Sequence, residues 1–281
     1  MYNIALIWIF CISSAYSEVL NPEEIAQDAQ QNIKTITTEE KVSQIECKSK
    51  GDGYIFAGGE CIQYIEAEGD KKDTLNIIVH GAWKEGTDTL ARYAVFVETI
   101  NLNTDITTVA VALPGYSQSS TNNFKGLLNG HNKPTLVGEK KYIVFMNELI
   151  KKLKQKYKAT TINYIGHSAG AILGATITGY NPKLIQNIVC AGGAYDIHKM
   201  MKNSKNLISL IDVVDNVDKS TNFLIVYGTK DTISTSKRNK NFYKALKSKG
   251  LNVKLIKVKG AKHLDLDMTS ASVDAITQMI E

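Results

Sequence analysis

The sequence predicts an α/β fold, with a mostly parallel sheet that has helices on both faces. Short apolar strands alternate with helical segments from residue 74 to the end of the chain, and this alternation is typical of parallel strands joined by right-handed crossovers. Glycine, histidine and aspartate repeatedly follow the strands, where open parallel sheets place their functional residues. A chain of 281 residues, 43% of them hydrophobic, suits one such domain with a large core.

Residues 1–17 have the features of a signal peptide. They carry no charged side chain, and the apolar run from Ile4 to Ile12 is followed by small and polar residues up to Ser17. The run is shorter than the about 20 residues of a membrane span. We therefore expect cleavage after Ser17 and a secreted or periplasmic protein without a stable membrane anchor. Because only the α-amino group supplies positive charge here, a buried first strand and a short anchor are the alternatives.

Residues 18–53 are predicted to form an N-terminal arm, and residues 54–281 the main domain. The arm is polar and acidic, with scattered isoleucine and valine, which fits a short helix or an irregular segment. Cys47 and Cys61 flank a glycine-containing stretch, so we expect a disulfide between them in an exported protein. Cys190 lies in an apolar run and is expected to be a buried thiol.

The elements of the domain follow from local patterns. A β-hairpin is expected over residues 54–66, and a charged turn over 68–73 precedes the next strand. Further strands are expected at 74–79, 107–113, 161–167, 187–191, 223–227 and 253–258. Helical spacing of apolar residues predicts helices at 88–100, 139–157, 236–249 and 270–280, and a further one after residue 168. Residues 117–134 form a long polar loop, a kind that is usually functional or mobile.

A Gly-X-Ser-X-Gly motif joins the 161–167 strand to the Ala- and Gly-rich helix that follows. It reads Gly166-His167-Ser168-Ala169-Gly170. This pattern is typical of a nucleophile elbow, a tight turn that raises one hydroxyl above the sheet. At so tight a turn a Cβ atom at either glycine would clash. The motif alone is a weak signal, because a glycine-rich turn between a strand and a helix has the same composition.

Serine needs an adjacent base to act as a nucleophile, and an imidazole held by a buried carboxylate supplies one. Three residues of these types follow predicted strands in the order Ser168, Asp231, His263. With the elbow, this order resembles the α/β-hydrolase superfamily. The other matching pieces are His80-Gly81, the stretch Leu113 to Ser119, Gly228-Thr229-Lys230-Asp231 and Gly260-Ala261-Lys262-His263. The resemblance covers residues 54–281, and its second half is similar to carboxylesterases and to prolyl-oligopeptidase-type peptidase domains.

The resemblance implies a role for each matching residue. Ser168 would be the nucleophile, His263 the general base and then acid, and Asp231 the residue that orients His263. The oxyanion hole would use the backbone N–H of Ala169 and that of Ala82 or Trp83. Cap domains of this superfamily follow the strand after the elbow, and the short segment 194–221 implies a small cap or none.

Other residues compete for some of these roles. Asp196 is the rival acid, because it also follows a predicted strand. The alternative role for Asp231 is a purely structural one, as the N-cap of the following helix. We expect His80 to be a structural hydrogen-bonding residue and His167 to pack or hydrogen-bond locally. Ala112 departs from the superfamily, many members of which have an acidic residue there, and this puts the geometry of the following loop in doubt.

The expected substrate is a small-molecule ester or amide, and an exported esterase is the first reading. Tyr116, Tyr195 and Trp83 are candidate pocket walls, and each has core packing as its alternative. An exported serine peptidase or amidase is the rival enzyme, and a non-catalytic binding protein of the same fold is the rival from another class. The intact set of Ser168, Asp231 and His263 argues against the binding protein.

Several function classes are not supported. No His, Cys, Asp or Glu residues show metal-ligand spacing, so no metal is expected. No dinucleotide or P-loop motif is present, so no cofactor is expected. The net charge of +5 comes from lysines spread along the chain, which fits a solvated surface and not a nucleic-acid interface.

Overall fold

The structure is a computed structural model that describes residues 41–83, 88–115, 119–124, 136–200 and 204–281. The predicted signal peptide (1–17) and most of the predicted arm (18–40) lie outside the described residues, as does Tyr116. Within the described residues, none of the helices combines the length and apolar character needed to cross a membrane.

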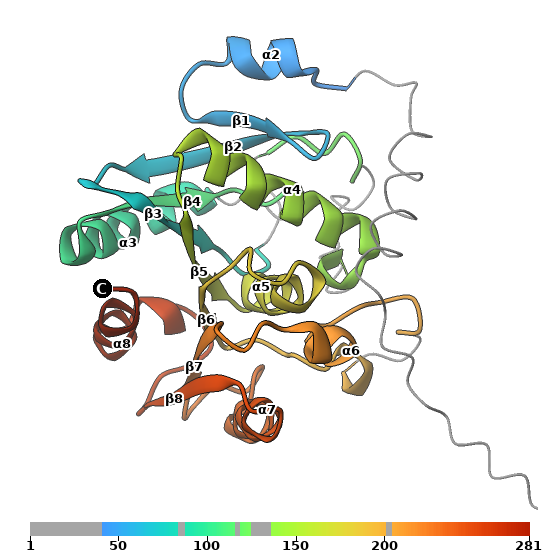
Figure 1. Cartoon of the computed structure of the whole chain (residues 1–281), viewed down its shortest axis with the longest axis vertical. Coiled ribbons are helices and arrows are strands. Elements are labelled where there is room, and N and C mark those ends of the chain that lie inside the picture. The colour runs from blue at the N-terminus through green and yellow to red at the C-terminus, as the bar shows by residue number, and fades with distance from the viewer. Residues whose placement is uncertain (1–40, 84–87, 116–118, 125–135, 201–203) are drawn as a thin grey trace, which may run out of the picture.

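In the described part of the chain, eight strands form one sheet in the order β1-β2-β4-β3-β5-β6-β7-β8 (Figure 1). β1 and β2 form an antiparallel hairpin, β2 is also antiparallel to β4, and every other neighbouring pair is parallel. The strands are Tyr54–Ala57 (β1), Glu60–Ala67 (β2), Lys71–Val79 (β3), Ile106–Val111 (β4), Thr161–His167 (β5), Asn187–Ala191 (β6), Asn222–Gly228 (β7) and Asn252–Val258 (β8). The predicted fold class, a mostly parallel sheet, is confirmed.

Helices cover both faces of the sheet (Figure 1). The helices of the described chain are Gln44–Ser49 (α2), Thr89–Thr104 (α3), Lys140–Lys156 (α4), Ala169–Tyr180 (α5), Leu210–Val213 (α6), Ser236–Ser248 (α7) and Ser270–Ile280 (α8). One core cluster lies between the sheet and α3 with α8, and a larger one lies under α4, α5, α6 and α7. Each face of the sheet is therefore covered, which explains why nearly every residue of β4, β5 and β6 is buried.

Short 3₁₀ turns complete the described chain: Leu136–Gly138 (η1), Ile197–Lys199 (η2), Val214–Asn216 (η3) and Leu266–Met268 (η4). Between β6 and β7, the described chain contains only η2, α6 and η3 as helical elements. This agrees with the expectation of a small cap or none.

Two predicted boundaries were wrong by three residues or more. β3 begins at Lys71, so residues 71–73, which we expected in a charged turn, belong to the strand. Lys71 pairs with β4 ahead of an irregularity in the register, and its N–H donates to the carbonyl of Asp105 at 3.0 Å. Helix α3 runs four residues past the predicted end at Ile100, because it continues to a left-handed cap at Asp105 (φ 56°).

The end of the N-terminal arm is attached to the domain. A disulfide joins Cys47 of α2 to Cys61 of β2, with a Cα–Cα distance of 5.4 Å. The backbone of Val42 exchanges two hydrogen bonds, of 2.9 and 2.8 Å, with the side chain of Asn122. Cys190 is a buried free thiol, as expected.

A row of asparagine side chains crosses the parallel part of the sheet. Asn76, Asn163, Asn187, Asn222 and Asn252 lie opposite one another on β3, β5, β6, β7 and β8. Each amide nitrogen donates to the amide oxygen of the preceding member, at 2.7 to 2.8 Å for the first three pairs, and Asn252 donates to Asn222. At the other end, Asn76 donates to the hydroxyl of Thr108 on β4 at 3.0 Å. We call these five residues the asparagine ladder.

Candidate active site

The turn between β5 and α5 has the geometry of a nucleophile elbow. Ser168 lies at φ 50° and ψ −112°, a strained conformation for a residue other than glycine. The surroundings are too close for side chains at the flanking glycines. A Cβ atom at Gly166 would lie 2.7 Å from the backbone of Ala171, and one at Gly170 would lie 2.2 Å from the carbonyl oxygen of Val79. The close backbone approach predicted from the glycine spacing is therefore present.

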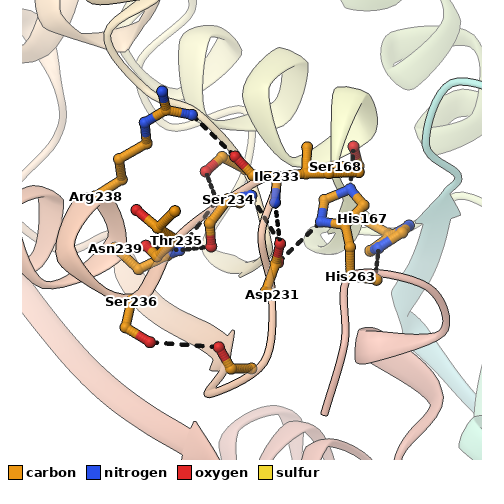
Figure 2. A network of polar contacts seen from close by, with 12 residues as sticks. His167, Ser168, Asp231, Ile233, Ser234, Thr235, Ser236, Arg238, Asn239 and His263 are labelled. Carbon is orange, nitrogen blue, oxygen red and sulfur yellow. Dashed lines mark hydrogen bonds and ion pairs between the residues drawn. The ribbon is translucent and has the colours of Figure 1, made fainter.

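Three side chains from distant parts of the sequence form a continuous chain of hydrogen bonds (Figure 2). The Nε2 atom of His263 lies 2.9 Å from the Oγ of Ser168, and its Nδ1 lies 2.9 Å from the Oδ2 of Asp231. Because a carboxylate accepts and does not donate, Nδ1 carries the hydrogen and Nε2 is free to accept from the serine hydroxyl. The structure thus brings together the three residues that the sequence singled out.

Asp231 is positioned as an ionised hydrogen-bond acceptor. Its side chain is fully buried, and its Oδ1 accepts the backbone N–H groups of Ile233 and Ser234, both at 2.8 Å. Burial by itself raises the pKa of Asp231, but the hydrogen bonds from His263, Ser234 and Ile233 outweigh burial and lower it below the usual 3.8. The rival acid, Asp196, instead caps η2 and pairs with Lys199 at 2.6 Å.

The segment after β3 lies directly against the serine. A Cβ atom at Gly81 would be 2.9 Å from the Cβ of Ser168. Ala82 is exposed and Trp83 is half-buried at this rim. This placement next to Ser168 is the one that an oxyanion hole formed by the N–H of Ala82 or Trp83 requires, and the assignment of these donors and of Ala169 stays a prediction.

His80 holds this segment in place. Its Nε2 accepts the N–H of Leu113 at 2.9 Å, and its Nδ1 therefore donates to the carbonyl of Gly81, 2.6 Å away. Complete burial lowers the pKa of His80 to about 4, so the ring is neutral and these two bonds persist near neutral pH. The structural role expected for His80 agrees with these contacts.

His167 supports the segment that carries His263. Its Nε2–H donates to the backbone carbonyl of His263 at 2.9 Å, and the two rings lie 5.1 Å apart. Gly192, which follows β6, also lies close to His263, because a Cβ atom there would lie 3.3 Å from the imidazole ring. Local hydrogen bonding, as expected for His167, is what the structure shows.

The loop after β4 is anchored despite the departure at Ala112. The carbonyl of Ala112 accepts the hydroxyl of Ser119 at 2.5 Å, and its N–H donates to Gln63 at 2.9 Å. Tyr116, a candidate pocket wall, lies outside the described residues.

Tyr195 lines a pocket of about 310 Å³ between η2, α6 and α7. Its ring stacks on Phe242 with a centroid distance of 3.7 Å, and its hydroxyl accepts the N–H of Gly193 at 3.0 Å. The lining of this pocket does not include Ser168, Asp231 or His263. Tyr195 is 5% exposed, so its contacts fit core packing, the alternative given for it, better than a wall beside Ser168.

The sequence alone did not identify some of the residues near the site. Arg92 of α3 forms an ion pair with Asp265, and the adjacent Tyr93 donates to Asp267 at 3.2 Å. Both contacts join α3 to the loop that follows His263. They connect residues more than 170 positions apart, and no sequence motif marks them.

Among the residues that the structure covers, no group of three or more His, Cys, Asp or Glu side chains could hold a metal ion.

Comparison with known proteins gives a consistent result. A family model described as the alpha/beta hydrolase fold matches residues 77–210. Est1E from Butyrivibrio proteoclasticus, in a structure with bound ferulic acid, is 17% identical, with 80% of this chain and 96% of that chain covered and a TM-score of 0.57. A search of curated proteins found no significant match.

Two further solved structures are similar. Esterase Pf2001 from Pyrococcus furiosus is 17% identical, with 78% of this chain and 91% of that chain covered and a TM-score of 0.55. The carboxylesterase from Bacillus cereus is 15% identical, with 77% and 92% covered and a TM-score of 0.53. At these identities the likeness is one of fold. The matching family model and the shared sheet architecture together show that the chain has the α/β-hydrolase fold.

Proposed function

We propose that the protein is a serine hydrolase that cleaves carboxylic esters through an acyl-enzyme on Ser168. The observation that carries the proposal is the continuous hydrogen bonding of Ser168 to His263 and of His263 to Asp231, each at 2.9 Å. A structural serine has no need of a neutral imidazole acceptor that is itself oriented by a buried carboxylate.

The geometry supports a two-step mechanism. As Ser168 Oγ attacks the ester carbonyl, His263 Nε2 takes its proton, and Asp231 stabilises the resulting imidazolium. The imidazolium then gives this proton to the departing alcohol, and the acyl group stays on Ser168. In the second step His263 activates a water molecule, which attacks the acyl-enzyme and releases the acid, and the proton returns to Ser168.

The developing negative charge on the carbonyl oxygen needs hydrogen-bond donors. We assign this role to the N–H of Ala169, at the start of α5, and to the N–H of Ala82 or Trp83. The N-terminus of a helix supplies unpaired N–H groups, and Gly81 brings the opposing segment against Ser168. Losing one such donor typically costs about 3 kcal/mol of transition-state stabilisation.

The substrate is proposed to be a small-molecule ester, and the protein is proposed to be exported. Similar folds carry the names of esterases, and the Est1E structure holds ferulic acid, so a feruloyl ester belongs in the first substrate panel. The Cys47–Cys61 disulfide is compatible with an oxidising compartment. N-terminal sequencing of the secreted form tests the predicted cleavage and should begin at Glu18.

The test of the function compares wild type, Ser168→Ala and a control, Ser220→Ala, whose exposed serine lies outside the site. Short-chain p-nitrophenyl esters and matched aminoacyl amides serve as substrates, and a fluorophosphonate serves as the covalent label. We expect ester turnover and labelling in the wild type and the control, and loss of both in Ser168→Ala with little change in Tm. Full turnover in Ser168→Ala refutes the proposal, and faster turnover of amides than of esters favours a peptidase or amidase.

A further inference from the structure

Arg92 lies between two loops of the candidate active site. Its guanidinium lies over the ring of Trp83, 4.7 Å from the ring centroid, and it forms an ion pair with Asp265. Trp83 belongs to the segment assigned to the oxyanion hole, and Asp265 follows His263 by two residues. One side chain of α3 thus contacts both the segment proposed to stabilise the oxyanion and the loop that carries the proposed base.

The contacts are poorly explained as a contribution to stability. The side chains of Arg92 and Asp265 are 34% and 43% exposed, and ion pairs this accessible contribute little to folding. The chemistry of the side chain instead suits a link between two partners. A planar guanidinium can stack on an indole ring through its face while its edge donates to a carboxylate.

A second contact from the same turn of α3 restrains the same loop. The hydroxyl of Tyr93 donates to the carboxylate of Asp267 at 3.2 Å, and Asp267 is buried. Asp265 itself takes a left-handed conformation with φ 55°. An aspartate tolerates this conformation, which fixes the direction of the loop at that residue. The loop is thus fixed at both Asp265 and Asp267 by adjacent residues of one helix.

We propose that Arg92 is a positioning residue that holds the Trp83 segment and the His263 loop at the spacing that acyl transfer requires. The inference rests on the proposed function. Arg92 acts through Trp83 and Asp265 and touches no reacting atom in this assignment. Small displacements of a base relative to the oxyanion donors are costly, because both must meet the same carbonyl group.

The test uses Arg92→Gln, Arg92→Lys and Asp265→Asn, and the last keeps a residue that tolerates the left-handed conformation. With a small p-nitrophenyl ester, we expect kcat of Arg92→Gln to fall about tenfold with KM little changed. Arg92→Lys should be intermediate, because lysine keeps the ion pair but lacks the planar stacking surface. The double variant Arg92→Gln/Asp265→Asn should be no worse than Arg92→Gln alone, since both changes break one link.

A salt titration separates positioning from folding. Because the ion pair is accessible, molar salt should screen it, so wild-type kcat should fall toward that of Arg92→Gln while the variant itself changes little. Glu98→Gln, an exposed charge change on the same helix, is the matched control and should behave as wild type in both assays. Loss of kcat in proportion to loss of Tm across all variants overturns the proposal.

A readout independent of activity separates this inference from the proposed function. The chain has two tryptophans, Trp8 and Trp83, and the proposed cleavage after Ser17 removes Trp8, so Trp83 emission can be read alone in the processed protein. Arg92→Gln should shift the emission to the red, because the indole ring loses the guanidinium that stacks on it. Asp265→Asn should do the same, because Arg92 loses the ion pair that holds it over the ring. An active wild type with unchanged kcat in Arg92→Gln overturns the positioning role and leaves the function intact. An inactive wild type overturns the function, and unchanged Trp83 emission in both variants then overturns the link as well.

Discussion

Lowering the pH from 7 to 5 should destabilise the protein through the buried imidazole of His80. In the folded state its pKa is lowered to about 4 by burial, whereas a histidine in an unfolded chain has a pKa of about 6.5. Below pH 6.5 the unfolded chain therefore binds a proton that the folded protein does not. Stability falls with pH through this window and levels off below pH 4.

The expected size follows from the two pKa values. The free energy of unfolding should fall, relative to pH 7, by about 2 kcal/mol at pH 5 and by about 3 kcal/mol below pH 4 because of His80. Protonation at Nε2 would also remove the acceptor of the Leu113 N–H, a bond of 2.9 Å that joins the ends of β3 and β4. Because the folded protein protonates His80 only near pH 4, the segment beside Ser168 should loosen only near and below that pH.

The assay is urea unfolding at several pH values between 7 and 4.5 for wild type and His80→Gln. A glutamine side chain can still accept from Leu113 but cannot titrate, so the difference between the two curves isolates His80 from every other group. The control is His198→Gln, which removes an accessible histidine that pairs with Asp212 and should keep the His80 contribution. Equal pH dependence in wild type and His80→Gln would refute the reasoning, as would an NMR titration that places the pKa of His80 near 6.5.

Two further predictions concern the acid and the disulfide. Asp231→Asn should lower kcat by about 10⁴-fold with little loss of Tm, because His263 loses the partner that fixes its tautomer. Asp196→Asn should leave ester turnover little changed. The reverse pattern in steady-state kinetics would make Asp196 the acid. Replacing Cys47 and Cys61, which lie 14 positions apart, by serine should lower the free energy of unfolding by about 3 kcal/mol. An identical urea midpoint for wild type with and without reductant would contradict this second expectation.

The parts of the fold that the sequence revealed depend on local patterns and one geometric rule. Apolar periodicity located the strands and the long helices, and the glycines around Ser168 located the elbow. The rule that parallel strands end at one edge then brought Ser168, Asp231 and His263 together, although they are 95 and 32 positions apart in their two contacts. Each of these steps reads either neighbouring residues or strand polarity. The choice of Asp231 over Asp196, which also follows a predicted strand, came from the resemblance to the α/β-hydrolase superfamily.

Contacts set by packing between distant segments were not readable in this way. Glu60, for example, is buried on β2 and accepts from Ser120 at 2.6 Å, Asn122 N–H at 2.8 Å and Asn123 N–H at 2.6 Å. Burial raises the pKa of this carboxyl, against the effect of the hydrogen bonds. A glutamate inside a predicted hairpin gives no sign that it anchors a loop 60 positions away. The ion pair of Arg92 with Asp265 escaped prediction for the same reason.

The asparagine ladder fixes the register of the parallel strands that carry the candidate site. An amide pair forms only between asparagines directly opposite each other, and a slip by one position would turn the side chain to the other face and move the strand by about 3.3 Å. Ser168 follows Asn163 by five positions, and Gly192 follows Asn187 by the same number. The ladder thus sets how far each strand extends, and with it the positions of the loops that meet around the imidazole of His263. An error of a single position along that line would exceed the length of the 2.9 Å bonds that join Ser168, His263 and Asp231.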